Sequence, residues 1–254
     1  MTGAWALRER LSPAARARLR RVADPVLAPV GSLVRVRGAG RHVALTFDDG
    51  PDPEHTAGVL DALAARRVTA TFFMLSERAE AEPELARRVV AEGHEIGLHG
   101  ADHARLTELT RAEVAERVIG GRRRLERVTG TRVRLFRPPY GAQSPRTWLT
   151  ARQAGMRVVV WNADTRDWAP EQTPEGVAAA AARLASPGAI LLLHDGTGAD
   201  AKVKTGGTGP GPAFDRGQAT TAVLEALADG GWLPGSVAAT LAIGRPVYSA
   251  WFRP

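Results

Sequence analysis

The feature that most constrains the fold is an alternation of short apolar runs and longer amphipathic segments from residue 42 onward. Short apolar runs are typical of buried strands, and amphipathic segments between them are typical of helices, so the alternation predicts a mostly parallel sheet. Seven such units in 254 residues predict a closed or nearly closed α/β barrel. The expected strands lie near residues 42–47, 68–74, 95–98, 133–136, 156–161 and 189–193, with a weaker one near 236–241, and the expected helices near 55–66, 83–92, 110–128, 145–154, 174–185 and 218–229.

The positive charge is concentrated before this region. Residues 1–41 hold nine arginines against Glu9 and Asp24, a net charge of +7 that equals the formal net charge of the whole chain. We therefore expect a basic N-terminal arm over residues 1–40, with a short strand near 33–36 at its end, and one main domain over residues 41–254. Within the arm, an amphipathic helix is expected, which either packs on the barrel or contacts an anionic membrane surface. Its apolar face consists of Leu11, Ala15, Leu19 and Val22.

Composition excludes several classes of protein. The chain has no cysteine, so a disulfide framework and a thiolate metal site are both excluded, and any bound metal must use His, Asp or Glu. It has no apolar run of 18 or more residues, and no signal-peptide core is seen near Met1, so we expect a cytoplasmic protein, at the inner membrane face if the arm binds lipid. Nucleic acid is not an expected partner, because no aromatic stacking residues are interleaved with the arginines of the arm.

Polar clusters follow several of the expected strands, which a barrel would bring to one rim. Asp48 and Asp49 end the first apolar run and precede Gly50. Two adjacent carboxylates repel each other, so they call for a cation or a strong hydrogen-bond donor; the alternative is a surface turn. His99 and His103 are four residues apart, a spacing that puts two rings on one helical face. With one aspartate they supply the three ligands of a catalytic zinc site; the alternative is a pair of ordinary loop histidines.

Three further clusters lie after later strands. In the segment 137–141, Arg137 can pair with a carboxylate, and two prolines fix the backbone so that the amide of Tyr140 suits an oxyanion; the alternative is a rigid proline turn. The segment 161–168 offers two acids between two tryptophans. His194 ends an apolar strand and can act as a general acid if a carboxylate supports it; otherwise it is a hydrogen-bonded strand-end residue. The Gly- and Pro-rich stretch 196–217 is a candidate lid or substrate loop.

In their order along the chain and in their residue patterns, these clusters resemble the motifs of the NodB-homology polysaccharide deacetylases, carbohydrate esterase family four. The resemblance covers roughly residues 41–243 and includes five motifs, at residues 46–50, 99–103, 137–141, 164–168 and 192–195. It implies a deformed (β/α)7-type barrel. It also implies metal-dependent removal of an N-acetyl group from an acetylated amino sugar, usually an N-acetylglucosamine unit, carried by a polysaccharide, a glycolipid or a glycosylated metabolite.

The resemblance also implies roles for individual residues. One divalent metal, most often zinc with cobalt, manganese or nickel as alternatives, would be bound by Asp49, His99 and His103. By the same resemblance, Asp48 would be the general base, and Arg137 would orient it. The amide of Tyr140 would face the oxyanion. His194 would be the general acid, with Asp164 as the first choice of partner carboxylate and Asp167 as the second, and the substrate-binding residues would be Pro139, Trp168 and Leu192. Gly100 departs from the family, which usually has Ser or Thr there, and this departure puts the rigidity of that loop in question.

Two other functions use the same barrel. One is an amidohydrolase acting on a small or cyclic amide, and the other is a non-catalytic barrel that binds a glycan without hydrolysing it. The complete set of base, metal ligands and acid favours the deacetylase.

Overall fold

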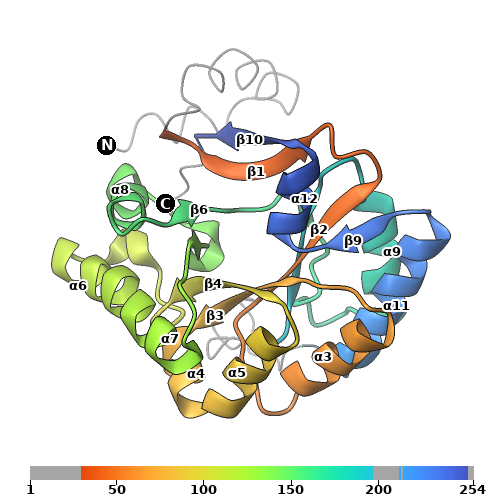
Figure 1. Ribbon diagram of the computed structural model, residues 1–254, viewed down its shortest axis with the longest axis horizontal. Coiled ribbons are helices and arrows are strands. Elements are labelled where there is room, and N and C mark those ends of the chain that lie inside the picture. The colour runs from red at the N-terminus through yellow and green to blue at the C-terminus, as the bar shows by residue number, and fades with distance from the viewer. Residues whose placement is uncertain (1–29, 197–211, 213, 251–254) are drawn as a thin grey trace.

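The computed structural model describes residues 30–196, 212 and 214–250, and its centre is a curled parallel sheet surrounded by helices (Figure 1). Within the described residues the sheet has eight strands, in the order β6-β5-β4-β3-β2-β8-β7, with β9 paired to β2 off this path. All of its strand pairs are parallel. The strands are β2 (His42–Asp48), β3 (Thr71–Leu75), β4 (Glu95–Gly100), β5 (Leu135–Phe136), β6 (Arg157–Val158), β7 (Ala163–Asp164), β8 (Ile190–His194) and β9 (Leu233–Gly235).

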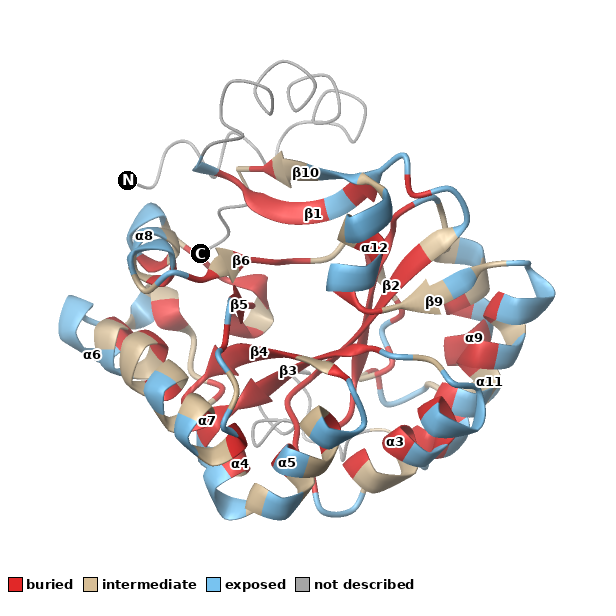
Figure 2. Cartoon of the chain, in the orientation of Figure 1, coloured by how far each residue is buried: buried red, intermediate tan, exposed pale blue. Residues whose placement is uncertain are grey.

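Helices cover the outside of the curled sheet, and the strands between them are largely buried (Figure 2). Several helices start where the sequence supplies an N-cap: Thr110 and Ser144 form capping boxes, and Thr173 accepts a hydrogen bond from Gly176 N. The helices are α3 (Thr56–Ala65), α4 (Ser76–Ala81), α5 (Pro83–Ala91), α6 (Arg111–Ala115), α7 (Gly121–Thr129), α8 (Pro145–Gln153), α9 (Pro174–Leu184), α11 (Arg216–Asp229) and α12 (Val237–Ile243), with a π-helical turn η3 (Glu116–Gly120) and short 3-10 turns η2 (Leu106–Glu108) and η4 (Pro139–Gly141).

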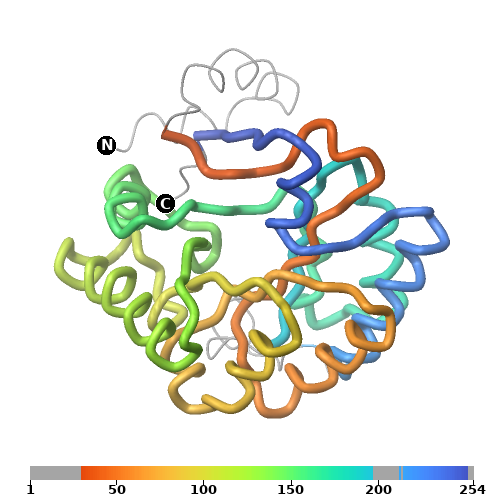
Figure 3. The backbone as a smooth tube through the Cα atoms, viewed as in Figure 1, coloured from red at the N-terminus to blue at the C-terminus, as the bar shows by residue number. Residues whose placement is uncertain are grey.

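The two ends of the described chain meet in a separate two-stranded antiparallel sheet of β1 (Ser32–Arg37) and β10 (Arg245–Ser249) (Figure 3). β1 also contacts the barrel: the carbonyl of Leu33 accepts from Val160 N at 2.9 Å, and Val36 N donates to Gly188 O at 2.8 Å. Leu33 and Val36 are wholly buried. The expected short strand at 33–36 is therefore confirmed, and it packs against the barrel.

The strand expected at residues 236–241 is wrong, because α12 occupies these positions. Ser236 caps this helix by accepting from Ala239 N at 3.1 Å, and Val237 N donates to Thr71 Oγ1 at 2.9 Å. The last strand of the barrel, β9, ends just before it. The division at residue 40 and the amphipathic helix of the arm stay predictions, since residues 1–29 lie outside the described part, as does most of the expected loop at 196–217. Among the described residues, none of the helices is long and apolar enough to span a membrane.

Candidate active site

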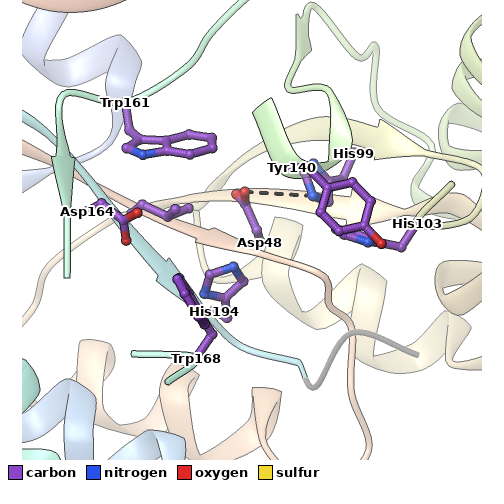
Figure 4. A pocket seen from close by; sticks show the side chains of 9 residues that line it. Asp48, His99, His103, Tyr140, Trp161, Asp164, Trp168 and His194 are labelled. Carbon is purple, nitrogen blue, oxygen red and sulfur yellow. Dashed lines mark ion pairs between the residues drawn. The ribbon is translucent and has the colours of Figure 1, made fainter. Parts of the chain in front are cut away.

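A pocket of about 210 Å³ opens where several parallel strands end. Its walls combine acids, histidines and aromatic rings that come from β2, β4, β7 and β8 and from the segments after β4, β5, β6 and β7 (Figure 4). The convergence expected from the sequence is therefore present. The lining residues are Asp48, His99, His103, Tyr140, Trp161, Asp164, Trp168, Leu192 and His194.

Asp49, His99 and His103 form a buried cluster whose ligand atoms lie within 4.8 Å of one another. Asp49 Oδ1 lies 3.3 Å from His99 Nε2 and 3.2 Å from His103 Nε2. The backbone of Asp49 is left-handed, with φ 77°, which breaks the alternation of β2 and lets its carboxylate turn toward the histidines. His99 Nδ1 lies 2.8 Å from the carbonyl of Arg137, so Nδ1 carries the proton and Nε2 is left to bind a metal. Two nitrogens and one carboxylate oxygen fit a divalent cation such as zinc.

Gly100 is required by the shape of the loop between the two histidines. Its φ is +116°, and a Cβ atom there would lie 2.8 Å from the carbonyl oxygen of Asp102. The loop is instead held by the Asp102 carboxylate, which accepts from Arg117 Nε at 3.0 and 3.1 Å and from Ala104 N at 3.2 Å. An ion pair thus braces the loop in a chain that has no hydroxyl at residue 100.

Asp48 and Arg137 form a buried ion pair at the floor of the site. Arg137 Nη1 donates to Asp48 Oδ1 at 2.6 Å and to Thr46 Oγ1 at 2.9 Å, and the arginine is 0% exposed. Burial lowers the pKa of Arg137 and the Asp48 carboxylate opposes that effect. Asp48 Oδ2 lies 3.8 Å from His99 Nε2, next to the cluster of Asp49, His99 and His103. The expected contact of Arg137 with the rim carboxylate is confirmed, and it leaves Oδ2 for the pocket.

Tyr140 has a left-handed backbone, with φ 60° and ψ 6°, directly after the two prolines. The turn is fixed by hydrogen bonds from Gly141 N to Pro138 O and from Ala142 N to Pro139 O, both at 2.9 Å. The ring of Tyr140 packs edge-on against His103, with 4.3 Å between centroids. The turn is therefore preorganised as expected, while the role of the Tyr140 amide toward an oxyanion stays a prediction.

The structure corrects the expected partner of His194, which is Asp167 and not Asp164. Asp167 Oδ1 lies 2.7 Å from His194 Nδ1, and Asp167 Oδ2 accepts from the backbone N–H of His194 at 2.8 Å. Asp164 instead accepts from Arg166 N at 2.9 Å and lines the pocket. The reason is the turn between the two acids: Arg166 adopts a left-handed φ of 55°, and this reversal brings Asp167 back beneath the end of β8.

The pKa values of the two acids shift in opposite directions. Burial raises the pKa of the Asp164 carboxyl above its ordinary value. Burial acts in the same direction on Asp167, but His194 and then Arg216 outweigh it, and the pKa of Asp167 falls below its ordinary value. Asp167 is therefore the carboxylate that can support a proton on His194.

Of the expected substrate-binding residues, Trp168 and Leu192 line the pocket, together with Trp161. Pro139 does not: it is buried beside Gly100, where its ring atoms would lie 3.7–3.9 Å from an added Cβ. Pro139 faces the loop of the two histidines, and its contact with a substrate stays a prediction.

Two polar residues at the site, Asp195 and Arg216, are not assigned a role from the sequence. Asp195 accepts from Gly50 N at 3.2 Å and from Thr56 Oγ1 at 2.7 Å, and burial raises its pKa to about 7. Arg216 donates to Asp167 from the first turn of α11. The position of Asp195 next to His194 is a signal that the sequence offers, whereas no pattern around Arg216 indicates its contact.

The curled α/β barrel thus brings a buried carboxylate–arginine pair, a His-His-Asp cluster and a carboxylate-supported histidine to one pocket. A family model described as polysaccharide deacetylase matches residues 35–159. A chitooligosaccharide deacetylase of Bradyrhizobium sp. (strain ANU 289) is 42% identical over 157 residues, which are 61% of this chain and 71% of the relative. A peptidoglycan-N-acetylglucosamine deacetylase of Bacillus cereus is 38% identical over 156 residues, 61% of this chain and 72% of the relative.

Solved structures agree with the sequence relatives. A peptidoglycan N-acetylglucosamine deacetylase in complex with 4-naphthalen-1-yl-N-oxidanyl-benzamide superposes with a TM-score of 0.73 at 27% identity, covering 84% of this chain and 94% of the other. The chain belongs to the polysaccharide deacetylase family with the NodB-homology fold, a (β/α)7-type barrel.

Proposed function

We propose that this protein is a metal-dependent carbohydrate N-deacetylase, which hydrolyses the N-acetyl group of an acetylated amino sugar and releases acetate. The observation that carries the proposal is the meeting, at one pocket, of a buried carboxylate–arginine pair, a His-His-Asp cluster and a carboxylate-supported histidine. Each is one of the parts that amide hydrolysis needs: a base for water, a site for an electrophile, and an acid for the leaving amine.

Asp49, His99 and His103 would hold the metal, for which zinc is our first choice because of the donor set. A divalent cation bound there supplies Lewis-acid chemistry, polarising a carbonyl and lowering the pKa of a water molecule. Asp48 stands beside the cluster with Oδ2 facing it, and Arg137 fixes the carboxylate through Oδ1. Asp48 therefore takes the proton of the attacking water as general base.

On the other side of the pocket His194 delivers a proton. Its Nδ1–H donates to Asp167, so Nε2 is the nitrogen that faces the substrate and protonates the departing amine. The Tyr140 amide donates to the oxyanion that develops on the acetyl group. Leu192 and Trp168 enclose the acetyl methyl group, and Trp161 extends the apolar wall. These assignments complete hydrolysis of the amide to an amine and acetate.

The names of the relatives, which refer to chitooligosaccharide and to peptidoglycan N-acetylglucosamine, support the substrate class that we propose. We propose an N-acetylglucosamine unit as the acetylated sugar, within an oligosaccharide, a polysaccharide or a lipid-linked glycan. The cytoplasmic location and the contact of the arm with an anionic membrane stay predictions.

A panel assay of acetate release tests the proposal. Purified wild-type protein and Asp48→Asn are incubated with chitooligosaccharides, peptidoglycan fragments, lipid-linked acetylated amino sugars and small cyclic amides. We expect acetate from at least one acetylated sugar with the wild type and almost none with Asp48→Asn. Hydrolysis of a cyclic amide alone would favour the amidohydrolase. Binding of a glycan without acetate release would favour the non-catalytic barrel.

A further inference from the structure

Arg216 lies behind the acid side of the pocket and is 4% exposed. It begins α11, directly after the N-cap residue Asp215, and is 49 residues from Asp167 in the chain. A single nitrogen, Nη1, donates to both Asp167 Oδ2 and the carbonyl oxygen of Asp167, each at 2.9 Å. One guanidinium therefore fixes both the side chain and the backbone of the residue that supports His194.

We propose that Arg216 is a positioning residue of this enzyme, which holds Asp167 in place and thereby sets the orientation and proton affinity of His194. The proposal rests on the proposed function. It assigns to the acid side of the pocket a buried arginine equivalent to Arg137 on the base side, where Nη1 donates to Asp48 at 2.6 Å.

The hydrogen bonds of Asp167 support this role. Oδ1 pairs with His194 Nδ1 at 2.7 Å, while Oδ2 accepts both from His194 N at 2.8 Å and from Arg216 at 2.9 Å. Because the carboxylate is 2% exposed, water does not replace a lost donor easily. Without Arg216, the carboxylate would keep only its contacts with His194 and would be held less firmly.

The charges around His194 indicate in which direction Arg216 changes the proton affinity of the histidine. Asp167 contacts its ring, Asp164 lines the same pocket, and Asp48 on β2 is its neighbour in register across the sheet. Arg216 is the cation behind Asp167, so it partly neutralises the carboxylate that stabilises a proton on His194. Arg216 thus keeps the protonated histidine acidic enough to give its proton to a leaving amine.

The test compares Arg216→Met with Arg216→Lys, Asp167→Asn and the control Arg66→Met. Arg66 is a matched control because it also forms an ion pair with α11, to Glu225 Oε1 at 2.6 Å, but on the exposed surface. Each metal-loaded protein is assayed for kcat and KM over a range of pH, with the acetylated sugar that the wild type deacetylates. Circular dichroism confirms that each variant is folded.

For Arg216→Met we expect kcat to fall about 10-fold or more with KM nearly unchanged, since general acid catalysis contributes about 10²–10⁴-fold. The alkaline limb of the pH profile moves to higher pH, because an un-neutralised Asp167 holds the proton on His194 more strongly. Arg216→Lys keeps the limb near its wild-type position, and Asp167→Asn moves it to lower pH. A folded Arg216→Met that behaves like Arg66→Met, or whose limb stays or moves to lower pH, overturns the proposal.

A second measurement does not depend on turnover. Nitrogen-15 NMR of the histidine rings, followed over a range of pH, reports the protonation of His194 directly. We expect the ring in wild type and in Arg216→Lys to lose its proton over the same pH range, and the ring in Arg216→Met to stay protonated to higher pH. An identical His194 signal in all three proteins overturns the inference. If the wild type deacetylates no sugar, the proposed function fails, and the NMR comparison still decides the role of Arg216.

Discussion

Removing Arg137 should destabilise the protein strongly, because it leaves a buried carboxylate without its counter-ion. The side chains of Arg137 and Asp48 are 0% and 3% exposed, and their charged atoms are 2.6 Å apart. Breaking such a pair from one side costs about 3–5 kcal/mol. Arg137→Met also removes the hydrogen bond to Thr46 and the cation–π contact with Phe73, whose ring centroid is 4.0 Å from the guanidinium carbon. We therefore expect the free energy of unfolding to fall by at least about 3 kcal/mol.

The measurement is urea unfolding, followed by circular dichroism, of wild type, Arg137→Met, Asp48→Asn and the double variant. All four are studied after chelation, so that metal binding does not contribute to the free energy of unfolding. The double variant has no uncompensated charge, so we expect a coupling energy of at least about 1.5 kcal/mol. The exposed pair of Arg66 and Glu225 is the control, and Arg66→Met should cost less than about 1 kcal/mol.

Two results would refute this reasoning. One is a loss below about 1 kcal/mol for Arg137→Met, which would mean that the pair is hydrated. The other is additivity of the two single variants within about 0.5 kcal/mol, the range expected of independent sites. Either result would also remove the argument that Arg137 fixes the general base.

Three further predictions concern the metal cluster and its surroundings. Asp48→Asn should bind metal as the wild type does but lose about 10²–10⁴-fold in activity, whereas His99→Ala should fail to retain metal in equilibrium dialysis. Gly100→Ser should cost about 1–3 kcal/mol in urea unfolding and weaken metal binding, since its φ of +116° disfavours a side chain; an unchanged midpoint would contradict this. In chelated protein Asp195, with its pKa raised to about 7 by burial, keeps its proton in the folded state while the unfolded state releases it near pH 4. The free energy of unfolding should therefore fall between about pH 4 and 7, by at most about 1.4 kcal/mol per pH unit, and Asp195→Asn should flatten this slope.

The sequence predicts the base and metal sides of the site well because their geometry is local. Asp48 ends β2 and Asp49 follows it, while His99 lies in β4 and His103 in the bend after it, and the apolar pattern of both strands is clear. The two histidines therefore meet through a strand and its following loop, and the expected helical face is wrong. Once parallel strands are inferred, their carboxyl ends must lie at one edge, so the convergence needs no further information.

The acid side could not be predicted to the same degree because it depends on contacts between distant segments. Asp164 and Asp167 lie in one short turn, and the choice between them depends on the left-handed backbone of Arg166 and on Arg216, which comes from a helix 49 residues beyond Asp167. Likewise, the pairing of β1 with β10 joins the two ends of the described chain, and residues 237–243 form a helix because Ser236 caps it. The hydrophobic periodicity of these segments does not show that β1 pairs with β10, and it does not distinguish the helix at 237–243 from a strand.

The central claim is most directly tested by measuring acetate release while metal is returned to chelated protein. The substrate is an N-acetylated chitooligosaccharide, or the sugar that proves active in the panel, and zinc is added in steps. We predict negligible release without metal and a linear rise to a plateau at one equivalent per chain, with no recovery in His99→Ala. Full activity in chelated protein, or recovery in His99→Ala equal to that of the wild type, would contradict the account.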